Sequence, residues 1–336
     1  MYRELCVIEK GPVFEKATAI QTKTIPTKVQ SNEVLLRHVY AGVNATDINA
    51  IQNTYGDLLT PPYPIGLEGL GQVTLVGSDV KHLHVGDYVV SYSRGGYSEY
   101  QIVSANVCFP VPTPDPHYLA LCVSGLTAAA AIGELGRPRT GEVALVTAAA
   151  GGTGTIAVQL LKHKYGCHVV GTCSSAEKEA YLKSIGCDAV INYKVGEAEL
   201  TEALRRAAPR GYDIVYECVG GALREAALQQ LAVGGRVIFI GAISGYKSGA
   251  TWRITEDEDL LRKSALLIKS ASLNGFLLTH FAETLPGYFA DLRQRYDAEE
   301  LKIHCDQNIF EGLEQAANAV AYLHSGKSFG KVVLKL

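Results

Sequence analysis

The sequence lacks long runs of like charge. Charged residues make up 19% of the 336 residues, and the formal net charge is −3. No segment concentrates Lys and Arg as a surface for nucleic acid or anionic lipid would. We therefore expect neither nucleic acid nor a membrane as a partner, although a few Lys or Arg side chains can still meet a ligand phosphate.

Closely spaced cysteines are also missing. None of the eight cysteines forms a Cys-x-x-Cys pair, and several lie in runs typical of strands. A disulfide framework or a four-cysteine zinc site needs closer grouping. We expect reduced cysteines that behave as small apolar residues. The eight are Cys6, Cys108, Cys122, Cys167, Cys173, Cys187, Cys218 and Cys305.

Long apolar runs are absent as well. The first residues show no signal-peptide core, and Gly or polar residues break the apolar stretches, so no membrane span is predicted. We expect a soluble, cytoplasmic protein. Lys335 and Leu336 match the last two positions of the Ser-Lys-Leu signal, which leaves import into a peroxisome-like organelle as an alternative.

What is present divides the chain into two parts. Up to residue 121, short β-like runs are separated by Gly, Pro and Asn, which predicts a mainly antiparallel β domain. From residue 122, apolar strands alternate with helix-like segments, which predicts an α/β fold with a doubly wound parallel sheet. We predict that residues 1–121 and 297–336 form one domain and residues 122–296 the other.

The predicted elements of the second domain are short and regularly spaced. Its strands are expected at residues 143–147, 168–172, 189–193, 214–218, 236–240 and 271–278, and its helices at 155–165, 177–185, 197–207 and 222–231. The last residues predict a helix at 312–324 and a strand at 331–336, which we expect to return to the first domain.

A glycine-rich turn follows the first of these strands. Such a turn, placed between a buried strand and a helix, lets backbone approach the pyrophosphate of a dinucleotide, and the helix start supplies N–H donors. The alternative is a tight structural turn. Ala149 stands where the first glycine of the G-x-G-x-x-G pattern would be, and Gly152 is additional. The predicted pyrophosphate site comprises Ala149, Gly151, Gly152, Thr153 and Gly154.

The end of the second strand of this domain indicates which dinucleotide binds. NAD sites place Asp or Glu there to hold the ribose 2′-hydroxyl, whereas this chain has Ser174, Ser175 and, one turn later, Lys178. Hydroxyls and an ammonium group suit a 2′-phosphate, so we predict NADPH (NADP) as the cofactor. Tyr193, after the third strand, is a further candidate donor. The alternative, that Ser174 and Ser175 cap the next helix, is compatible with this role.

The motifs at residues 42–49, 66–71, 86–87 and 96–100 resemble landmarks of the medium-chain dehydrogenase/reductase superfamily, and the match runs over the whole chain. Residues 124–128 and the glycine turn are similar to its quinone oxidoreductase and enone reductase branches. Within these, the segment Ile243-Ser-Gly-Tyr246 resembles an element of prostaglandin reductases, most of all those of type 3. The resemblance implies a GroES-like catalytic domain beside a Rossmann domain.

The same resemblance bears on metal binding. Zinc-dependent members carry Cys where this chain has Asn44, and His where it has Leu67. Leu cannot bind zinc, and Asn is a poor ligand beside thiolate or imidazole. The four-cysteine lobe that would follow Asp87 is missing. We therefore expect no metal, and the cofactor must supply the difficult chemical step.

By resemblance, Ile243 and Tyr246 contact the cofactor, and Tyr246 is our first catalytic candidate. A hydride that adds to an alkene conjugated to a carbonyl leaves negative charge on the oxygen, which a hydrogen-bond donor stabilises. A purely structural tyrosine is the alternative. Further catalytic candidates that the resemblance places near the nicotinamide are Asn44, Asp47 and Tyr55, although Asp47 also suits a turn.

Other positions resemble cofactor contacts of relatives. Ser124 and Thr127 are expected at the nicotinamide end, and Asn274, Gly275 and Phe276 beside it. Ser328 stands where relatives often place Asn. Glu68, in a Gly-rich segment, suggests a structural carboxylate.

Three functions remain open at this point. The first is reduction of α,β-unsaturated ketones and aldehydes, including 15-oxo-prostaglandin-like lipids, and the second is NADPH:quinone oxidoreduction. The third is a non-catalytic NADPH-binding or RNA-binding relative, which the lack of a basic patch disfavours. We also expect a homodimer, formed by pairing of the apolar strand at 271–278 across a two-fold axis.

Overall fold

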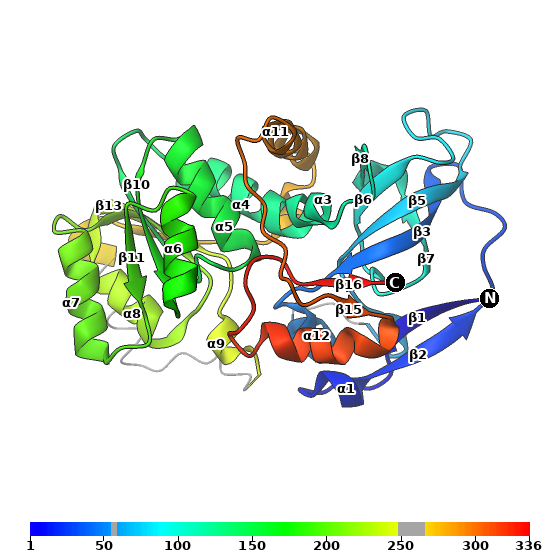
Figure 1. Ribbon diagram of the computed structural model, residues 1–336, viewed down its shortest axis with the longest axis horizontal. Coiled ribbons are helices and arrows are strands. Elements are labelled where there is room, and N and C mark those ends of the chain that lie inside the picture. Colours follow the sequence, from blue (N-terminus) through cyan, green and yellow to red (C-terminus); the bar gives the residue numbers. More distant parts are fainter. Residues whose placement is uncertain (55–58, 248–265) are drawn as a thin grey trace. The chain divides into compact units, whose positions relative to one another are not determined.

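The computed structural model describes residues 1–54, 59–247 and 266–336, so Tyr55 lies outside the described residues (Figure 1). The chain divides into two compact units. Unit 1 comprises Met1–Val123 and His304–Leu336, and unit 2 comprises Ser124–Ile303. The predicted boundaries, after residues 121 and 296, lie near these two divisions.

Unit 1 is built on two sheets. In the described residues, a three-stranded sheet has the order β2-β1-β4, and a larger sheet follows the path β15-β16-β3-β5-β6-β8, with β7 also paired to β3. All pairs are antiparallel except β15 with β16. The strands are β1 (Tyr2–Val7), β2 (Thr18–Lys23), β3 (Glu33–Gly42), β4 (Tyr63–Pro64), β5 (Glu68–Val76), β6 (Tyr88–Tyr92), β7 (Tyr100–Ser104), β8 (Cys108–Val111), β15 (Phe310–Glu311) and β16 (Val333–Lys335).

The tail of the chain completes this unit. Strand β16 pairs antiparallel with β3, so that Leu334 lies opposite Ala41, and Figure 1 shows this red strand joined to blue ones. Valines and leucines on β3, β5, β6 and β7 form one core, because they recur on the buried face of each strand. The helices of the unit are α1 (Phe14–Ala17), α2 (Asp47–Gln52), α3 (Pro116–Ala120) and α12 (Ala316–Leu323).

Unit 2 contains a parallel sheet, as predicted. In the part of the chain that the structure describes, six strands run in the order β11-β10-β9-β12-β13-β14. The strands are β9 (Val143–Val146), β10 (His168–Cys173), β11 (Ala189–Asn192), β12 (Tyr212–Glu217), β13 (Leu231–Phe239) and β14 (Ser272–Gly275). The helices include α4 (Leu126–Ala130), α5 (Gly152–Gln159), α6 (Ala176–Ser184), α7 (Glu197–Ala207), α8 (Gly221–Gln229), α9 (Ile243–Tyr246) and α11 (Leu285–Asp297).

The strand order locates the ligand-binding edge of unit 2. After β9 the chain builds outward through β10 and β11, and then returns to place β12 on the other side of β9. The carboxyl ends of β9 and β12 therefore flank the point where the winding reverses, which is where open α/β sheets bind ligands. The central strands are almost wholly buried, in agreement with their continuous Val, Leu and Ile runs.

Strand β7 begins at Tyr100, and the preceding Ser98 forms a bridge with Glu4 of β1. The helical run Pro116–Gly136 is long and apolar enough, by length and composition alone, to cross a membrane. However, 78% of its most apolar window is buried inside the protein, as in the core helix of a soluble protein.

Candidate functional site

The turn after β9 is tied to the neighbouring strand. Ala148 adopts a left-handed backbone with φ of 48°. Its N–H donates to Thr172 Oγ1 at 3.2 Å, and the N–H of Ala149 donates to the Thr172 carbonyl at 3.0 Å. The N–H of Gly151 then bonds back to the Ala148 carbonyl at 2.9 Å. The chain thus reverses tightly and enters α5.

The glycines of this turn differ in what requires them. A Cβ on Gly154 would lie 2.4 Å from the Ala148 oxygen and 2.8 Å from Ala149 Cα, so α5 can pack on the turn only with glycine at this position. A Cβ on Gly151 would meet its nearest heavy atom at 3.2 Å. The internal packing therefore demands Gly154 strictly and Gly151 much less, which leaves Gly151 suited to close approach by a ligand.

The start of α5 presents backbone donors. The first hydrogen bond along the helix runs from Thr155 N–H to the Gly151 carbonyl at 3.0 Å. The N–H groups of Gly152, Thr153 and Gly154 come before it and, within the described residues, donate to no protein carbonyl. Together with the positive end of the helix dipole, they fit a pyrophosphate.

The side chain of Thr153 has a separate role. Its hydroxyl donates to the Ser124 carbonyl at 3.0 Å and lies 2.7 Å from the Tyr216 hydroxyl. The structure thus brings Ser124, two residues before α4, to the glycine turn, and Thr127 lies on α4 itself. Thr153 is available to a ligand through its N–H rather than through its hydroxyl.

The residues after β10 form the second part of the predicted cofactor site. Ser175 is the N-cap of α6, and its hydroxyl oxygen accepts from the Lys178 N–H at 3.3 Å. The capping alternative is therefore realised, yet a hydroxyl that accepts one bond still has a proton to donate. Of the nearby acids, Glu177 is exposed and Glu179 is paired with Lys183 at 2.7 Å.

No carboxylate ends β10, whose last residue is Cys173. Ser174 and Lys178 are half-buried beside the cap, so hydroxyl and ammonium groups follow the end of β10, and groups of this kind suit a phosphate. Tyr193 follows β11 and packs partly against the core of unit 2, with its N–H donating to the Cys173 carbonyl at 3.1 Å.

Tyr246 ends the short helix α9, which follows β13. The side chain is buried, and its hydroxyl oxygen accepts from the Ala242 N–H at 3.2 Å. A Cβ on Gly241 would lie 2.4 Å from that oxygen, so the glycine makes room for the phenol. The hydroxyl of Tyr246 is thereby fixed at the carboxyl edge of the sheet, and Ile243 begins the same helix.

The other residues predicted to contact the cofactor are spread over both units. Asn274 and Gly275 end β14, and the Asn274 amide donates to Ser272 Oγ at 3.0 Å. Phe276 stacks on Phe281, with ring centroids 4.9 Å apart. Ser328 belongs to unit 1, where its hydroxyl donates to the Leu323 carbonyl at 3.4 Å.

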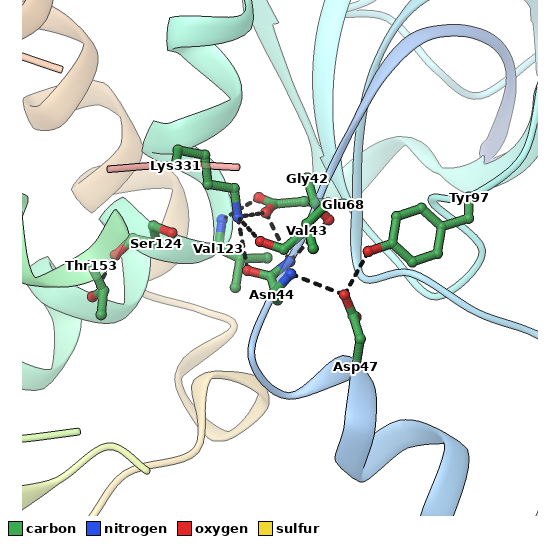
Figure 2. Close-up of polar contacts among 10 residues, drawn as sticks. All are labelled: Gly42, Val43, Asn44, Asp47, Glu68, Tyr97, Val123, Ser124, Thr153 and Lys331. Atoms are coloured by element: carbon green, nitrogen blue, oxygen red, sulfur yellow. Dashed lines mark hydrogen bonds and ion pairs between the residues drawn. The ribbon is translucent and has the colours of Figure 1, made fainter. Parts of the chain in front are cut away.

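Unit 1 contains a buried polar network formed by Lys331, Glu68 and Asn44 (Figure 2). The Lys331 ammonium pairs with Glu68 Oε1 and donates to Asn44 Oδ1 at 2.8 Å. The Asn44 amide donates in turn to Glu68 Oε1 at 3.0 Å. The other oxygen of Glu68 accepts from the Val123 N–H at 2.8 Å.

Lys331 is not among the site residues predicted from the sequence, because a lysine at the start of a strand usually lies on a solvated face. The only signal was that Lys331 precedes the buried residues Val332 and Val333. Since Asn44 also donates to the Gly42 carbonyl at 3.2 Å, its amide group is engaged on both sides. This arrangement favours a positioning role for Asn44, and it agrees with a structural carboxylate at Glu68.

Asp47 lies next to this network at the start of α2. Its Oδ2 accepts from the Tyr97 hydroxyl at 2.6 Å and from the Asn44 N–H at 2.9 Å (Figure 2). Its Oδ1 has no hydrogen-bond partner among the described residues. Burial raises the pKa of Asp47 to about 6, although the bonds from Tyr97 and Asn44 favour the ionised form. The alternative of a carboxylate that shapes a turn is supported by the bond to Asn44.

Within residues 1–54, 59–247 and 266–336, no three His, Cys, Asp or Glu side chains are grouped so that they would hold a metal ion.

Comparison with known proteins gives the family. Residues 30–113 match the alcohol dehydrogenase GroES-like domain, and residues 152–293 match the zinc-binding dehydrogenase family. The chain is 45% identical to a probable quinone oxidoreductase of Leishmania amazonensis, over 100% of this chain and 98% of that protein. It is 40% identical to prostaglandin reductase-3 of Mus musculus, over 99% of this chain and 89% of that protein.

The chain belongs to the medium-chain dehydrogenase/reductase superfamily. A solved structure agrees with this assignment: the mycobacterial protein Rv1454c complexed with NADPH superposes with a TM-score of 0.86 and 27% identity, and 100% of each chain is covered. Within the superfamily, the chain falls in the quinone oxidoreductase and prostaglandin reductase branch. It is an NADPH-dependent oxidoreductase. The predicted family, fold, cofactor and enzyme class are confirmed.

The resemblance drawn from the sequence places Asn44 where zinc-dependent members of the superfamily carry Cys. The structure shows what that residue does instead: its oxygen accepts from the Lys331 ammonium, and its N–H₂ donates to Glu68. A positive charge that belongs to the protein therefore lies beside Asn44.

Proposed function

We propose that the chain uses NADPH to reduce the carbon–carbon double bond of α,β-unsaturated ketones and aldehydes, including 15-oxo-prostaglandin-like lipids. The observation that carries this proposal is the phenol of Tyr246, which is held at the carboxyl edge of the sheet by the Ala242 N–H. Similarity to prostaglandin reductase-3 supports it.

Two groups of residues in unit 2 would bind different phosphates of the cofactor. The N–H groups at the start of α5 would hold the pyrophosphate, and Ser174, Ser175 and Lys178 would hold the 2′-phosphate. Bound NADPH supplies the hydride. If the pyrophosphate and the 2′-phosphate are held in this way, the nicotinamide would lie at the carboxyl edge of β12 and β13.

Tyr246 is then the donor that the reaction requires. Negative charge develops on the substrate carbonyl oxygen, and a preorganised hydrogen-bond donor stabilises it. A tyrosine hydroxyl is both a donor and an acceptor of hydrogen bonds. We expect Tyr246→Phe to lower kcat about 100- to 1,000-fold, as loss of such a donor does elsewhere, with little change in the KM for NADPH.

Quinone reduction is the second candidate function. The 45% identical relative is a probable quinone oxidoreductase, and the cofactor site described here serves either reaction. The two functions differ in the product, because enone reduction saturates a carbon–carbon bond, whereas quinone reduction gives a hydroquinone.

The test is NADPH oxidation with a 15-keto-prostaglandin, a long-chain enone, an enal and 1,4-naphthoquinone, followed by product analysis. Saturated products from the first three would support the proposal. Turnover of the quinone alone would assign the second candidate function, and activity of Tyr246→Phe equal to that of the wild type would remove Tyr246 as the donor.

We also propose that two copies pair through β14. This strand ends the sheet of unit 2, and within the described residues it hydrogen-bonds only to β13. Exposed apolar side chains gather around it: Leu267 is 82% exposed and Ile268 75% exposed, and Leu273 and Leu277 are also exposed. An uncovered edge strand with apolar side chains is a natural pairing surface. Light scattering should give the mass of a dimer, and Leu273→Lys should give that of a monomer.

For the location we propose the cytoplasm. The alternative rests on the C-terminal Lys-Leu alone. Removal of the last two residues should leave the distribution of a tagged protein unchanged, whereas a peroxisomal protein would be redistributed.

A further inference from the structure

Glu217 ends β12 at the point where the winding of the sheet reverses. The side chain is fully buried. Its Oε1 accepts from the N–H groups of Val219 at 2.7 Å and Gly220 at 2.8 Å, so the carboxyl group turns onto the loop that follows it. No catalytic or cofactor role for Glu217 follows from the sequence motifs discussed above.

This loop carries the helix of Tyr246. The Cys218 carbonyl accepts from the Ile243 N–H, and the Val219 carbonyl accepts from the Ser244 N–H, both at 3.1 Å. The Ser244 hydroxyl donates to the same Val219 carbonyl at 2.6 Å. Helix α9 has only four residues, so these bonds from the loop, rather than its own turns, fix its place.

The other side of the loop is joined to the glycine turn. The Cys218 N–H donates to Thr147 Oγ1 at 2.8 Å, and Thr147 directly precedes the turn. Thr147 Oγ1 also lies 3.5 Å from Glu217 Oε1. Glu217 therefore stands between the part of unit 2 that would bind pyrophosphate and the part that holds Tyr246.

The second carboxyl oxygen of Glu217 makes the burial of this side chain energetically unfavourable. Oε2 is buried and has no hydrogen-bond partner among the described residues. Burial raises the pKa of Glu217, against the opposing effects of the Gly220 and Val219 N–H groups and of Arg224 on α8. A buried carboxyl group with one unpaired oxygen lowers the stability of the folded protein. We therefore expect Glu217 to be useful at this position through the two N–H groups from which Oε1 accepts.

We propose that Glu217 is a positioning residue: its Oε1 fixes the loop 218–221, and the loop fixes α9 and the hydroxyl of Tyr246. This inference rests on the proposed function of Tyr246. It requires an acceptor oxygen at this position rather than a negative charge. It predicts a larger effect on turnover than on cofactor affinity, because the predicted phosphate contacts lie at α5 and after β10, whereas α9 carries only the predicted contacts of Ile243 and Tyr246.

The experiment compares Glu217→Gln with Glu217→Leu, which are similar in size. Gln keeps an acceptor oxygen, and Leu does not. Glu217→Leu should lower kcat about 10- to 100-fold, as expected when two buried N–H groups lose their acceptor, while the KM for NADPH changes less than about threefold. Glu217→Gln should keep kcat within about threefold of the wild type. Exposed Glu197→Leu on α7 is the control.

A second measurement needs neither substrate nor cofactor. Amide hydrogen exchange in segments 218–221 and 243–246 of the cofactor-free protein should be faster in Glu217→Leu than in the wild type, and unchanged in Glu217→Gln. If the wild type reduces no enone, the proposed function fails, but exchange and NADPH affinity still decide whether Glu217 positions the loop.

Three outcomes would overturn the inference. The first is unchanged kcat and exchange in Glu217→Leu. The second is equal impairment of the Gln and Leu variants, which would mean that the charge matters rather than the acceptor. The third is a parallel loss of NADPH affinity, turnover and thermal stability in Glu217→Leu, which would show a merely structural role.

Discussion

The buried network of unit 1 and the glycine turn of unit 2 use polar groups in opposite ways. In the network, Lys331, Glu68 and Asn44 engage one another and nearby backbone. At the start of α5, Gly152, Thr153 and Gly154 leave backbone N–H groups that no described carbonyl accepts. Polar groups that are paired with one another stabilise the fold and orient their side chains, whereas unpaired backbone donors are suited to bind a ligand. This difference is the reason why we propose phosphate binding at the start of α5 and a positioning role for the network.

The largest effect is expected from opening the closed network. Lys331→Met leaves the Glu68 carboxylate buried without its cation, which should cost about 3–5 kcal/mol in the free energy of unfolding. Denaturant titration measures this loss. The double variant Lys331→Met/Glu68→Gln should recover a large part of it, and a double variant no more stable than Lys331→Met would contradict the pairing.

Asp47, beside the network, should make stability depend on pH. Its folded pKa of about 6 lies above the value for an unfolded Asp. The protonated form is therefore favoured by folding, and its contribution is full below about pH 4 and lost as the pH rises through 6. From pH 4 to 7, the wild type should lose about 2–3 kcal/mol relative to Asp47→Asn. Equal pH profiles for the two proteins would refute the raised pKa.

The two glycines of the turn should separate stability from binding. Gly154→Ala forces a Cβ against Ala148 and should destabilise unit 2 by about 1–3 kcal/mol. Gly151→Ala should change stability much less, yet weaken NADPH binding because its Cβ occupies the ligand side. Thermal unfolding and NADPH fluorescence titration together test this. A similar loss of stability in both variants would contradict the different packing requirements of Gly154 and Gly151.

The smallest effect is expected at the 2′-phosphate. Lys178→Asp should raise the KM for NADPH about tenfold, through loss of one charge-assisted bond, and change that for NADH much less. Lys183→Asp, on the same helix, is the control. Equal changes for the two cofactors would remove Lys178 from the site.

The difference between the network and the glycine turn also explains which features could be predicted from the sequence. The glycine turn and the parallel strands are local patterns, and the comparisons confirm the fold and the cofactor to which they pointed. The Ser175 cap was likewise visible as a local alternative. Each of these patterns spans only a few residues, so each can be recognised from a single segment of the sequence.

Lys331 and Glu217 could not be found in this way. Lys331 is 263 residues from Glu68 along the chain, and only the pairing of β16 with β3 makes them neighbours. Glu217 looks like an ordinary strand end until the loop 218–221 is seen to hold α9. The placement of Tyr97 against Asp47 is also a long-range contact. Such roles depend on tertiary structure, which residue patterns do not encode locally.

The pairing of β16 with β3 has a consequence for the order of events on the ribosome. Asn44 and Glu68 emerge early, but Lys331 emerges only after the whole of unit 2 has been synthesised. Domains fold as units while synthesis proceeds. Unit 2 therefore has its complete sequence first, and until residue 331 arrives the nascent unit 1 holds a carboxylate without its cation.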